Sequence, residues 1–137
     1  MRVVLDTNVL VSALISSGGW PDRLYQAWRT GLFELISSEE QLDEFRRVTR
    51  YPRLRPFLES AAAGAMFNEI RLLAEIVRHL PKVEISPDPD DNFLLAMAQE
   101  GHADYLVTGD KGDLLALSRY KGTHIVTVAR MVELLNQ

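Results

Sequence analysis

Two aspartates each follow a short apolar run of the sequence. Asp6 comes directly after Val3-Val4-Leu5, and Asp110 comes after Tyr105-Leu106-Val107 with only two residues between. Carboxylates gathered in one place repel one another, so a protein that clusters them generally compensates with a cation. All-oxygen ligands favour a hard ion, and the expected cofactor of such a cluster is Mg²⁺ or Mn²⁺.

The residue types that the sequence lacks exclude several catalytic mechanisms. The chain has no cysteine, which excludes disulfides, thiolate metal sites and cysteine nucleophiles. Its three histidines form no close pair in the sequence, so nothing indicates a two-histidine acid–base mechanism. A water molecule activated by a bound cation needs no nucleophile from the protein. The pattern therefore favours metal-dependent hydrolysis of a phosphate ester.

Length and composition indicate how many domains the chain forms and where in the cell we expect the protein. With 137 residues and 47% hydrophobic composition, residues 1–137 fit one domain that folds without disulfides. Asp6 and Asn8 interrupt the first apolar run too early for a signal peptide, and no apolar stretch is long enough to cross a membrane. Together with the absence of cysteine, this predicts a soluble, cytoplasmic protein.

The overall charge opposes binding of a polyanion, because the net charge is −4. Nucleic acid must therefore be held locally, by a cation in an acidic pocket and by arginines around it. The candidate phosphate contacts are Arg46 and Arg50, on a predicted helix, and Lys111 beside Asp110. A solvated basic helix end is the alternative interpretation of the arginines.

The elements that must position these residues alternate along the chain. Short β-branched runs predict strands at 3–5, 33–36, 83–85, 105–107 and 125–126. Helices are predicted at 9–15, 21–30, 38–50, 93–98, 113–118 and 129–135, and segment 57–80 as one long helix or two. Ser38 and Gln41 have the spacing of a capping box. The alternation predicts an α/β fold, a mostly parallel central sheet flanked by helices on both faces.

Such a sheet binds ligands outside the carboxyl ends of its strands. Asp6 and Asp110 are therefore expected to share one pocket if their strands are neighbours. Thr7, Asn8 and Thr108, which adjoin them, are expected to support the acids rather than to bind metal themselves.

Four acidic segments of this sequence occur in the same order as in a known family. They are Val3-Val4-Leu5-Asp6-Thr7-Asn8-Val9, Glu44-Phe45-Arg46-Arg47-Val48, Asp88-Pro89-Asp90-Asp91-Asn92-Phe93-Leu94-Leu95-Ala96 and Leu106-Val107-Thr108-Gly109-Asp110. With these segments the whole chain resembles the PIN domains, and within them the bacterial and archaeal branch of toxin components of toxin–antitoxin systems.

This resemblance implies a Mg²⁺- or Mn²⁺-dependent endoribonuclease that is typically oligomeric, as a dimer or higher, and inhibited in the toxin branch by a small antitoxin protein. The catalytic and metal-binding acids that it implies are Asp6, Glu44, Asp91 and Asp110. Glu44 is preferred to its neighbours Glu39, Glu40 and Asp43 mainly because of the family pattern. A non-catalytic nucleic-acid or protein binding module derived from a PIN nuclease is the alternative function.

Several of these acids also have a purely structural interpretation. Asp6 is suited to cap the helix that follows it. Asp113, three residues after Asp110, is either an auxiliary, water-mediated metal ligand or an ordinary helix-start residue.

Helix-start chemistry separates the adjacent acids Asp90 and Asp91. With Asp88 as N-cap and Pro89 at the first helical position, Asp91 falls in the first turn, where the helix dipole favours an ionised carboxylate. We therefore expect Asp91 to bind metal and Asp90 to be dispensable.

Two other classes that place aspartates at strand ends fit less well. A phospho-receiver domain needs an aspartate at the end of a mid-chain strand, and none follows 33–36. A phosphatase of the haloacid dehalogenase type needs Asp-x-Asp after the first strand, where Asn8 takes the second position.

Overall fold

The computed structural model describes residues 1–109 and 112–137. The strands are β1 (Arg2–Leu5), β2 (Glu34–Ser38), β3 (Glu75–Val77), β4 (Tyr105–Thr108), β5 (Arg119–Tyr120) and β6 (Thr123–Thr127). The helices are α1 (Thr7–Ile15), α2 (Trp20–Arg29), α3 (Glu39–Thr49), α4 (Ser60–Leu73), α5 (Pro89–Glu100), α6 (Gly112–Leu117) and α7 (Val128–Leu135), with a 3₁₀ turn, η1 (Pro52–Leu54).

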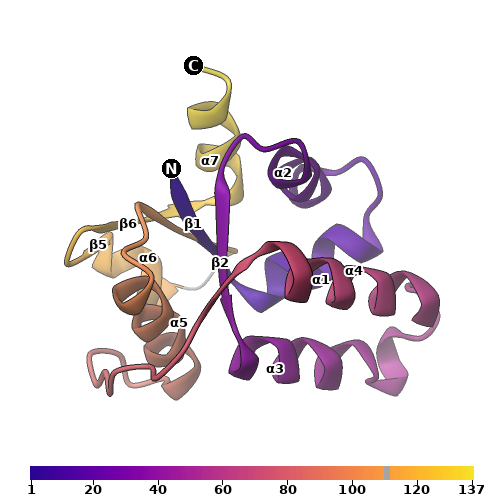
Figure 1. The fold of residues 1–137 in the computed structure, drawn as a ribbon, viewed down its shortest axis with the longest axis horizontal. Helices are drawn as coiled ribbons and strands as arrows, with labels where there is room; N and C mark the ends of the chain where they lie inside the picture. Colours follow the sequence, from indigo (N-terminus) through magenta and orange to yellow (C-terminus); the bar gives the residue numbers. More distant parts are fainter. Residues whose placement is uncertain (110–111) are drawn as a thin grey trace.

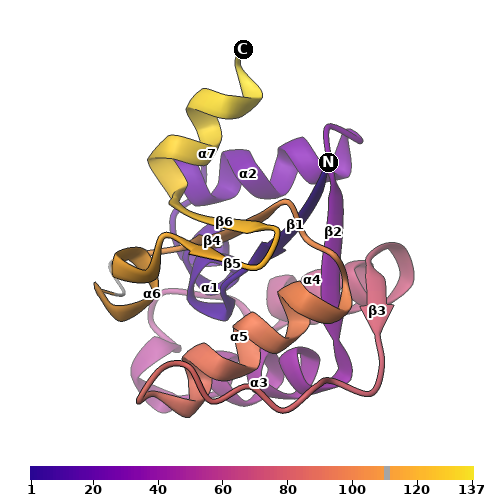
Figure 2. The ribbon, with the colours of Figure 1, turned by 90° about the vertical axis from the view of Figure 1, so that its left-hand side faces the viewer.

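One sheet in the order β3-β2-β1-β4-β6-β5 forms the centre of the molecule (Figures 1 and 2). All neighbouring strands run parallel except β5, which pairs antiparallel with β6. The predicted α/β fold with a mostly parallel sheet is confirmed. Within the described ranges, no helix combines the length and the apolar character that crossing a membrane requires.

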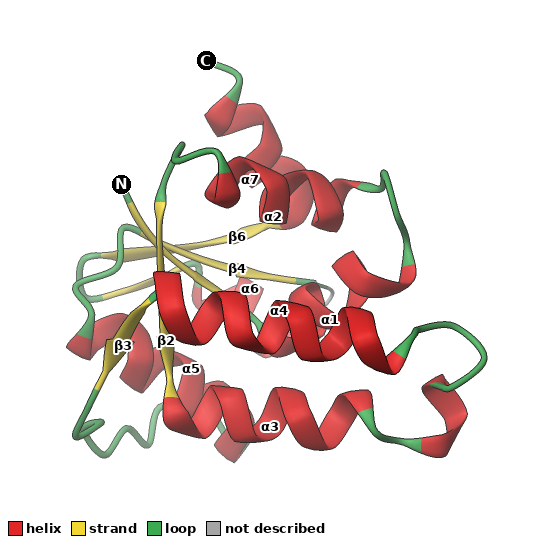
Figure 3. Ribbon diagram, turned by 45° about the vertical axis from the view of Figure 1, so that its right-hand side comes forward, coloured by secondary structure: helices red, strands yellow, loops and turns green. Residues whose placement is uncertain are grey.

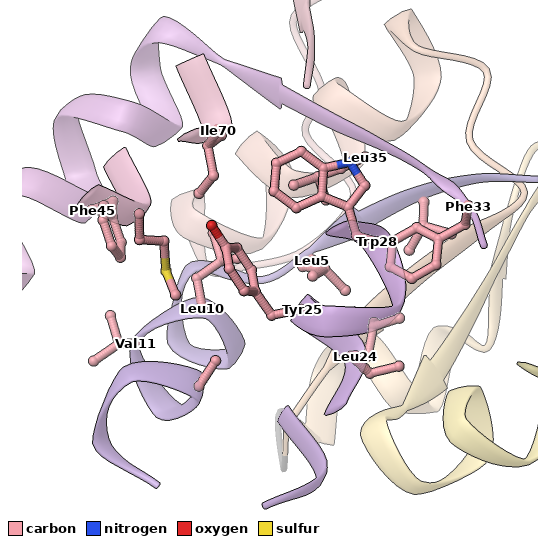
Figure 4. Packing of buried hydrophobic residues seen from close by; sticks show 14 of the residues in the cluster. Leu5, Leu10, Val11, Leu24, Tyr25, Trp28, Phe33, Leu35, Phe45 and Ile70 are labelled. Atoms are coloured by element: carbon pink, nitrogen blue, oxygen red, sulfur yellow. The ribbon is translucent and has the colours of Figure 1, made fainter. Parts of the chain in front are cut away.

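Helices cover both faces of the sheet, with α5 and α6 on one side and α1, α2, α3, α4 and α7 on the other (Figure 1). Successive side chains of a strand point to opposite faces. Val3 and Leu5 accordingly join the larger hydrophobic cluster, and Val4 joins the smaller one. Figure 4 shows the larger cluster, where Tyr25 and Trp28 of α2 pack edge to face with ring centroids 5.4 Å apart. Burial on both faces explains why the strands read as continuous apolar runs.

The predicted strands at 3–5, 33–36, 105–107 and 125–126 correspond to β1, β2, β4 and β6. The helix predicted from Ser38 is α3, and its N-cap is correct because the Ser38 hydroxyl accepts from the backbone N–H of Gln41 at 3.1 Å. The reciprocal half of the predicted capping box is wrong. The Gln41 side chain instead donates to the carbonyl of Leu5 at 2.7 Å.

The region between α3 and α5 corrects two predictions. The segment 57–80 is not continuously helical, because α4 ends at Leu73 and Glu75–Val77 pairs with β2 as an edge strand. This strand occupies the edge of the sheet. The prediction of a strand at 83–85 is wrong. The backbone N–H of Ile85 donates to the Asn92 side chain at 3.0 Å rather than to a neighbouring strand. The short strand β5 was not predicted.

Candidate active site

Asp6 lies at the carboxyl edge of the sheet, where β1 and β4 pair with Leu5 opposite Val107. Its carboxylate is only 2% exposed, and it accepts hydrogen bonds from the Thr108 hydroxyl at 2.9 Å and from the backbone N–H of Asn8 at 3.2 Å. Asp6 is thus the N-cap of α1 and also lines a pocket at this edge. The capping interpretation of Asp6 is confirmed, and its position beside the pocket leaves the prediction that it binds metal open to test.

The pocket beside Asp6 has a volume of about 130 Å³ and a strongly polar wall. It is lined by Asp6, Asn8, Glu44, Arg47, Val48, Tyr51, Asp90 and Leu94. Asp6 comes from the end of β1, Glu44 from α3 and Asp90 from the first turn of α5. Three acids that are far apart in the sequence therefore surround one small space, which we call the acidic pocket.

Asp91 lies in the first turn of α5 as predicted, with Asp88 as the N-cap and Pro89 at the start of the helix. It is 2% exposed, and one of its carboxylate oxygens accepts from the Ser86 hydroxyl at 3.0 Å. Asp90 is exposed, and it is Asp90 rather than Asp91 that lines the acidic pocket. The two adjacent acids therefore differ in burial, with Asp91 enclosed and Asp90 facing solvent.

The side chain of Asn92 makes several of the hydrogen bonds that hold the segment before α5. Its carbonyl oxygen accepts from the backbone N–H groups of Ile85 and Ser86 at 3.0 and 2.8 Å, and its amide donates to the Ser86 carbonyl at 2.8 Å. Asn92 thereby fixes Ser86, which in turn contacts Asp91.

The donor set of the acidic pocket fits a hard divalent cation, because it consists of carboxylate oxygens, one of them nearly enclosed. Among residues 1–109 and 112–137, no three acidic or histidine side chains converge as ligands of one metal ion. The described carboxylates therefore do not form a complete ligand set by themselves, whereas Mg²⁺ in proteins typically completes its shell with water and phosphate oxygens.

The remaining predicted acids do not add to this pocket in the part of the chain that is described. Asp110 and Lys111 lie outside the described residues. Asp113 is exposed in the first turn of α6 and is not among the residues that line the acidic pocket.

Arg47 brings a positive charge to the acidic pocket. Interaction with Tyr51, chiefly a hydrogen bond, raises the pKa of the Arg47 guanidinium, and attraction to Glu44 and Asp90 raises it further. Arg47 was not among the arginines selected from the sequence. Its position one helical turn after Glu44, on the same helix face, is the sequence signal that identifies it.

Arg46 and Arg50, which were selected from the sequence, lie on the opposite flank of α3. They line a second pocket of about 260 Å³ between α3 and α4, two helices that lie side by side in Figure 3. The guanidinium carbon of Arg46 stands 4.2 Å from the ring centroid of Phe67 in α4. Neither arginine lines the acidic pocket.

A buried polar network ties α3 to the end of β1. The Gln41 amide donates to the Leu5 carbonyl at 2.7 Å and lies 3.4 Å from the Thr7 hydroxyl, and its carbonyl oxygen accepts from Ser37 at 2.7 Å. Because Leu5 immediately precedes Asp6, this network fixes the helix that carries Glu44 relative to Asp6. The sequence did not reveal this role, since Gln41 also suited a capping box.

Comparison with known proteins agrees with this arrangement. The sequence pattern of the PIN domain matches residues 2–112. The uncharacterized protein MJ1680 of Methanocaldococcus jannaschii is 30% identical over 126 residues, which cover 85% of this chain and 75% of that protein. No solved structure matches the chain significantly. The pattern of the PIN domain spans most of the chain, including β1, α3 and α5, and the chain therefore belongs to the PIN-domain family.

Proposed function

We propose that this protein is an endoribonuclease that hydrolyses RNA phosphodiesters at the acidic pocket with Mg²⁺ or Mn²⁺. PIN domains are generally nucleases that use divalent metals, so membership of the family supports a nuclease-like module. The observation that carries the proposal is the meeting of Asp6, Glu44 and Asp90 around one pocket at the carboxyl edge of the sheet. Asp91, next in sequence to Asp90, adds a buried carboxylate.

In this proposal Asp6 and Glu44 hold the cation from the wall of the acidic pocket. Asp91, which is buried beside Asp90 and does not line the pocket, and Asp110, which lies outside the described residues, are the further proposed ligands. A bound Mg²⁺ or Mn²⁺ lowers the pKa of a water molecule and offsets the charge of the scissile phosphate. Thr108 and the backbone N–H of Asn8 keep the Asp6 carboxylate in one orientation. Arg47 presents a permanent positive charge where the polyanion approaches.

We also propose that residues 1–137 form one domain, which acts in the cytoplasm as the toxin of a toxin–antitoxin pair. We further propose that the protein self-associates as a dimer or higher oligomer. Large apolar side chains between α3 and β3 support an interface, since Phe57, Leu72 and Leu73 are 62%, 80% and 66% exposed. Analytical ultracentrifugation tests the oligomer, and a concentration-independent monomer contradicts it. Co-purification with the product of an adjacent small gene tests the antitoxin.

Cleavage of mixed RNA by the purified full chain tests the enzymatic proposal. We expect cleavage with Mn²⁺ or Mg²⁺, none with EDTA and none by Asp6→Asn, with products that carry 5′-phosphate and 3′-hydroxyl ends. Ends with 2′,3′-cyclic phosphate would contradict the mechanism, because they require attack by the 2′-hydroxyl of the RNA. RNA binding without cleavage under every metal condition would instead support the non-catalytic module.

A further inference from the structure

The pocket between α3 and α4 combines aromatic, cationic and amide groups. The residues on which the inference depends are Phe45, Arg46, Arg50, Gly64, Phe67 and Asn68. Phe45 and Phe67 are buried, whereas Arg46, Arg50 and Asn68 are exposed. The pocket flanks the same turns of α3 that present Glu44 and Arg47 to the acidic pocket on the other side. A chain that occupies the acidic pocket can thus reach the second pocket across the carboxyl end of α3.

The carboxyl end of α3 carries a local excess of positive charge. Five of the fifteen basic residues of the chain fall between positions 46 and 55, and no acidic residue does. All five side chains are exposed, and none lies within 4.0 Å of a carboxylate in the described ranges. They are Arg46, Arg47, Arg50, Arg53 and Arg55. In a chain of net charge −4, this segment provides the local attraction that a polyanion needs.

The guanidinium of Arg46 is arranged for stacking. Its guanidinium carbon lies 4.2 Å from the centroid of the Phe67 ring, and Arg46 also lines the pocket. Unpaired bases of RNA stack on arginine planes and aromatic rings, and they hydrogen-bond through edges that the Asn68 amide can match. A volume of about 260 Å³ suits a group smaller than a drug-sized ligand.

We propose that the α3–α4 pocket binds one unpaired base of single-stranded RNA whose backbone crosses the arginines at the end of α3 to the acidic pocket. This inference rests on the proposed ribonuclease function and names its substrate class. A base in a duplex is stacked and paired, so it must unpair before it enters such a pocket. An acidic peptide would satisfy the arginines, but its carboxylate side chains supply no aromatic ring to stack on Arg46.

Gly64 offers a direct way to fill the pocket. It lines the pocket from α4, and a Cβ atom built at this position meets no other atom within 4 Å. Gly64→Leu therefore extends a side chain into the space, while Gly64→Ala leaves most of it open. Ala61→Leu is the matched control, because Ala61 is exposed on the same helix and does not line the pocket.

Binding is measured by fluorescence anisotropy in EDTA, with a labelled 12-nucleotide single strand, the same strand with abasic sites, and a duplex of equal length. We expect tighter binding of the intact single strand than of the other two. Gly64→Leu should weaken binding of the intact strand about tenfold, within the range measured for loss of one stacked base. Ala61→Leu should bind as the wild type does.

Arg46→Lys supplies a second variant that keeps the charge and removes the planar group. It should weaken binding of the intact strand and leave binding of the abasic strand unchanged. The base pocket is contradicted if duplex and single strand bind equally, or if Gly64→Leu binds RNA as tightly as the wild type does. It is also contradicted if polyglutamate displaces RNA from the wild type but not from Gly64→Leu. Because binding is measured without metal, failure to cleave RNA is a separate result that contradicts only the proposed function.

Discussion

The two flanks of α3 differ in charge although the same turns of the helix form both. On one flank, Glu44 faces Asp6 and Asp90 around a space of about 130 Å³. On the other, Arg46 and Arg50 stand over Phe67 beside a space of about 260 Å³. A helix with its side chains is about 10–12 Å across. The carboxylates and the unpaired arginines of the described ranges therefore lie close together without neutralising each other.

If the proposed function holds, this separation lets an acidic chain present a surface for RNA. Carboxylates must stay clustered to attract a divalent cation, and arginines placed among them would compete with that cation. Arg47 is the exception, since it stands on the acidic flank. The comparison predicts that changes on the acidic flank alter metal binding and chemistry, whereas changes on the arginine flank alter RNA affinity alone.

The largest effect is expected for Asp6→Asn. It should lower the cleavage rate at saturating RNA at least about a hundredfold, because it removes a charge at the centre of the site. Asparagine keeps one oxygen that can accept from the backbone N–H of Asn8, and its amide can donate to the Thr108 hydroxyl, so the free energy of unfolding of the metal-free protein should stay equal or rise. Urea unfolding in EDTA measures this, and a loss of stability that accounts for the lost activity would contradict the assignment.

A comparison of Asp91→Asn with Asp90→Asn distinguishes a buried acid from an exposed one. We expect Asp91→Asn to lower Mn²⁺ affinity and cleavage about tenfold to a hundredfold, and Asp90→Asn to change either only slightly. Isothermal titration with Mn²⁺ and single-turnover cleavage provide the two measurements. Since Asp90 lines the acidic pocket, an inactive Asp90→Asn beside an active Asp91→Asn would shift the metal ligand by one residue.

Arg47→Gln is expected to have a smaller effect, and to change metal binding and RNA binding in opposite directions. Removing the cation beside Glu44 and Asp90 should raise the Mn²⁺ affinity of the free protein a few-fold and raise the KM for RNA. Both effects should shrink as salt is added, because exposed charges are screened. Arg55→Gln is the control, since Arg55 is exposed in the same segment and lines neither pocket. If Arg55→Gln also changes Mn²⁺ affinity, the charge separation across α3 is wrong.

The smallest effect is expected for substitutions of glycine, first in α4, the helix that packs beside Arg46 and Arg50. Gly64→Ala should raise the free energy of unfolding by about 0.5–1 kcal/mol, because alanine is favoured over glycine inside a helix and its Cβ meets no neighbour here. Gly18→Ala should have the opposite sign, since Gly18 has a φ of +79°. Denaturant unfolding of both variants measures the difference, and a destabilised Gly64→Ala would contradict the space observed at this position.

Most of the fold could be predicted because the strands are short, β-branched and bounded by turn residues. β1, which ends at Leu5 just before Asp6, and β4, which ends at Thr108, fall where the sequence placed them. The edge strand Glu75–Val77 could not be predicted, because it directly continues the apolar periodicity of α4 and is fixed only by pairing with β2. Local patterns do not contain that pairing.

Of the candidate site, only the features that depend on local chemistry could be predicted from the sequence. The start of α5 follows from Asp88 and Pro89, whose capping chemistry is local. The selection of Arg46 and Arg50 left out Arg47, because the direction in which each arginine points depends on where α4 and α5 pack against α3. Gln41 was assigned to its own helix, while in the fold it holds the end of a distant strand.

The hydrogen bond between Thr108 and Asp6 joins residues that are 102 positions apart. During synthesis at about 5–20 residues per second, β4 leaves the ribosome roughly 5 to 20 seconds after β1. Until then the central strand has no partner on that side, and Asp6 lacks the hydroxyl that orients it. A nascent or truncated chain that stops before β4 therefore cannot assemble the acidic edge. Any activity that depends on the orientation of Asp6 is therefore delayed until β4 has been synthesised.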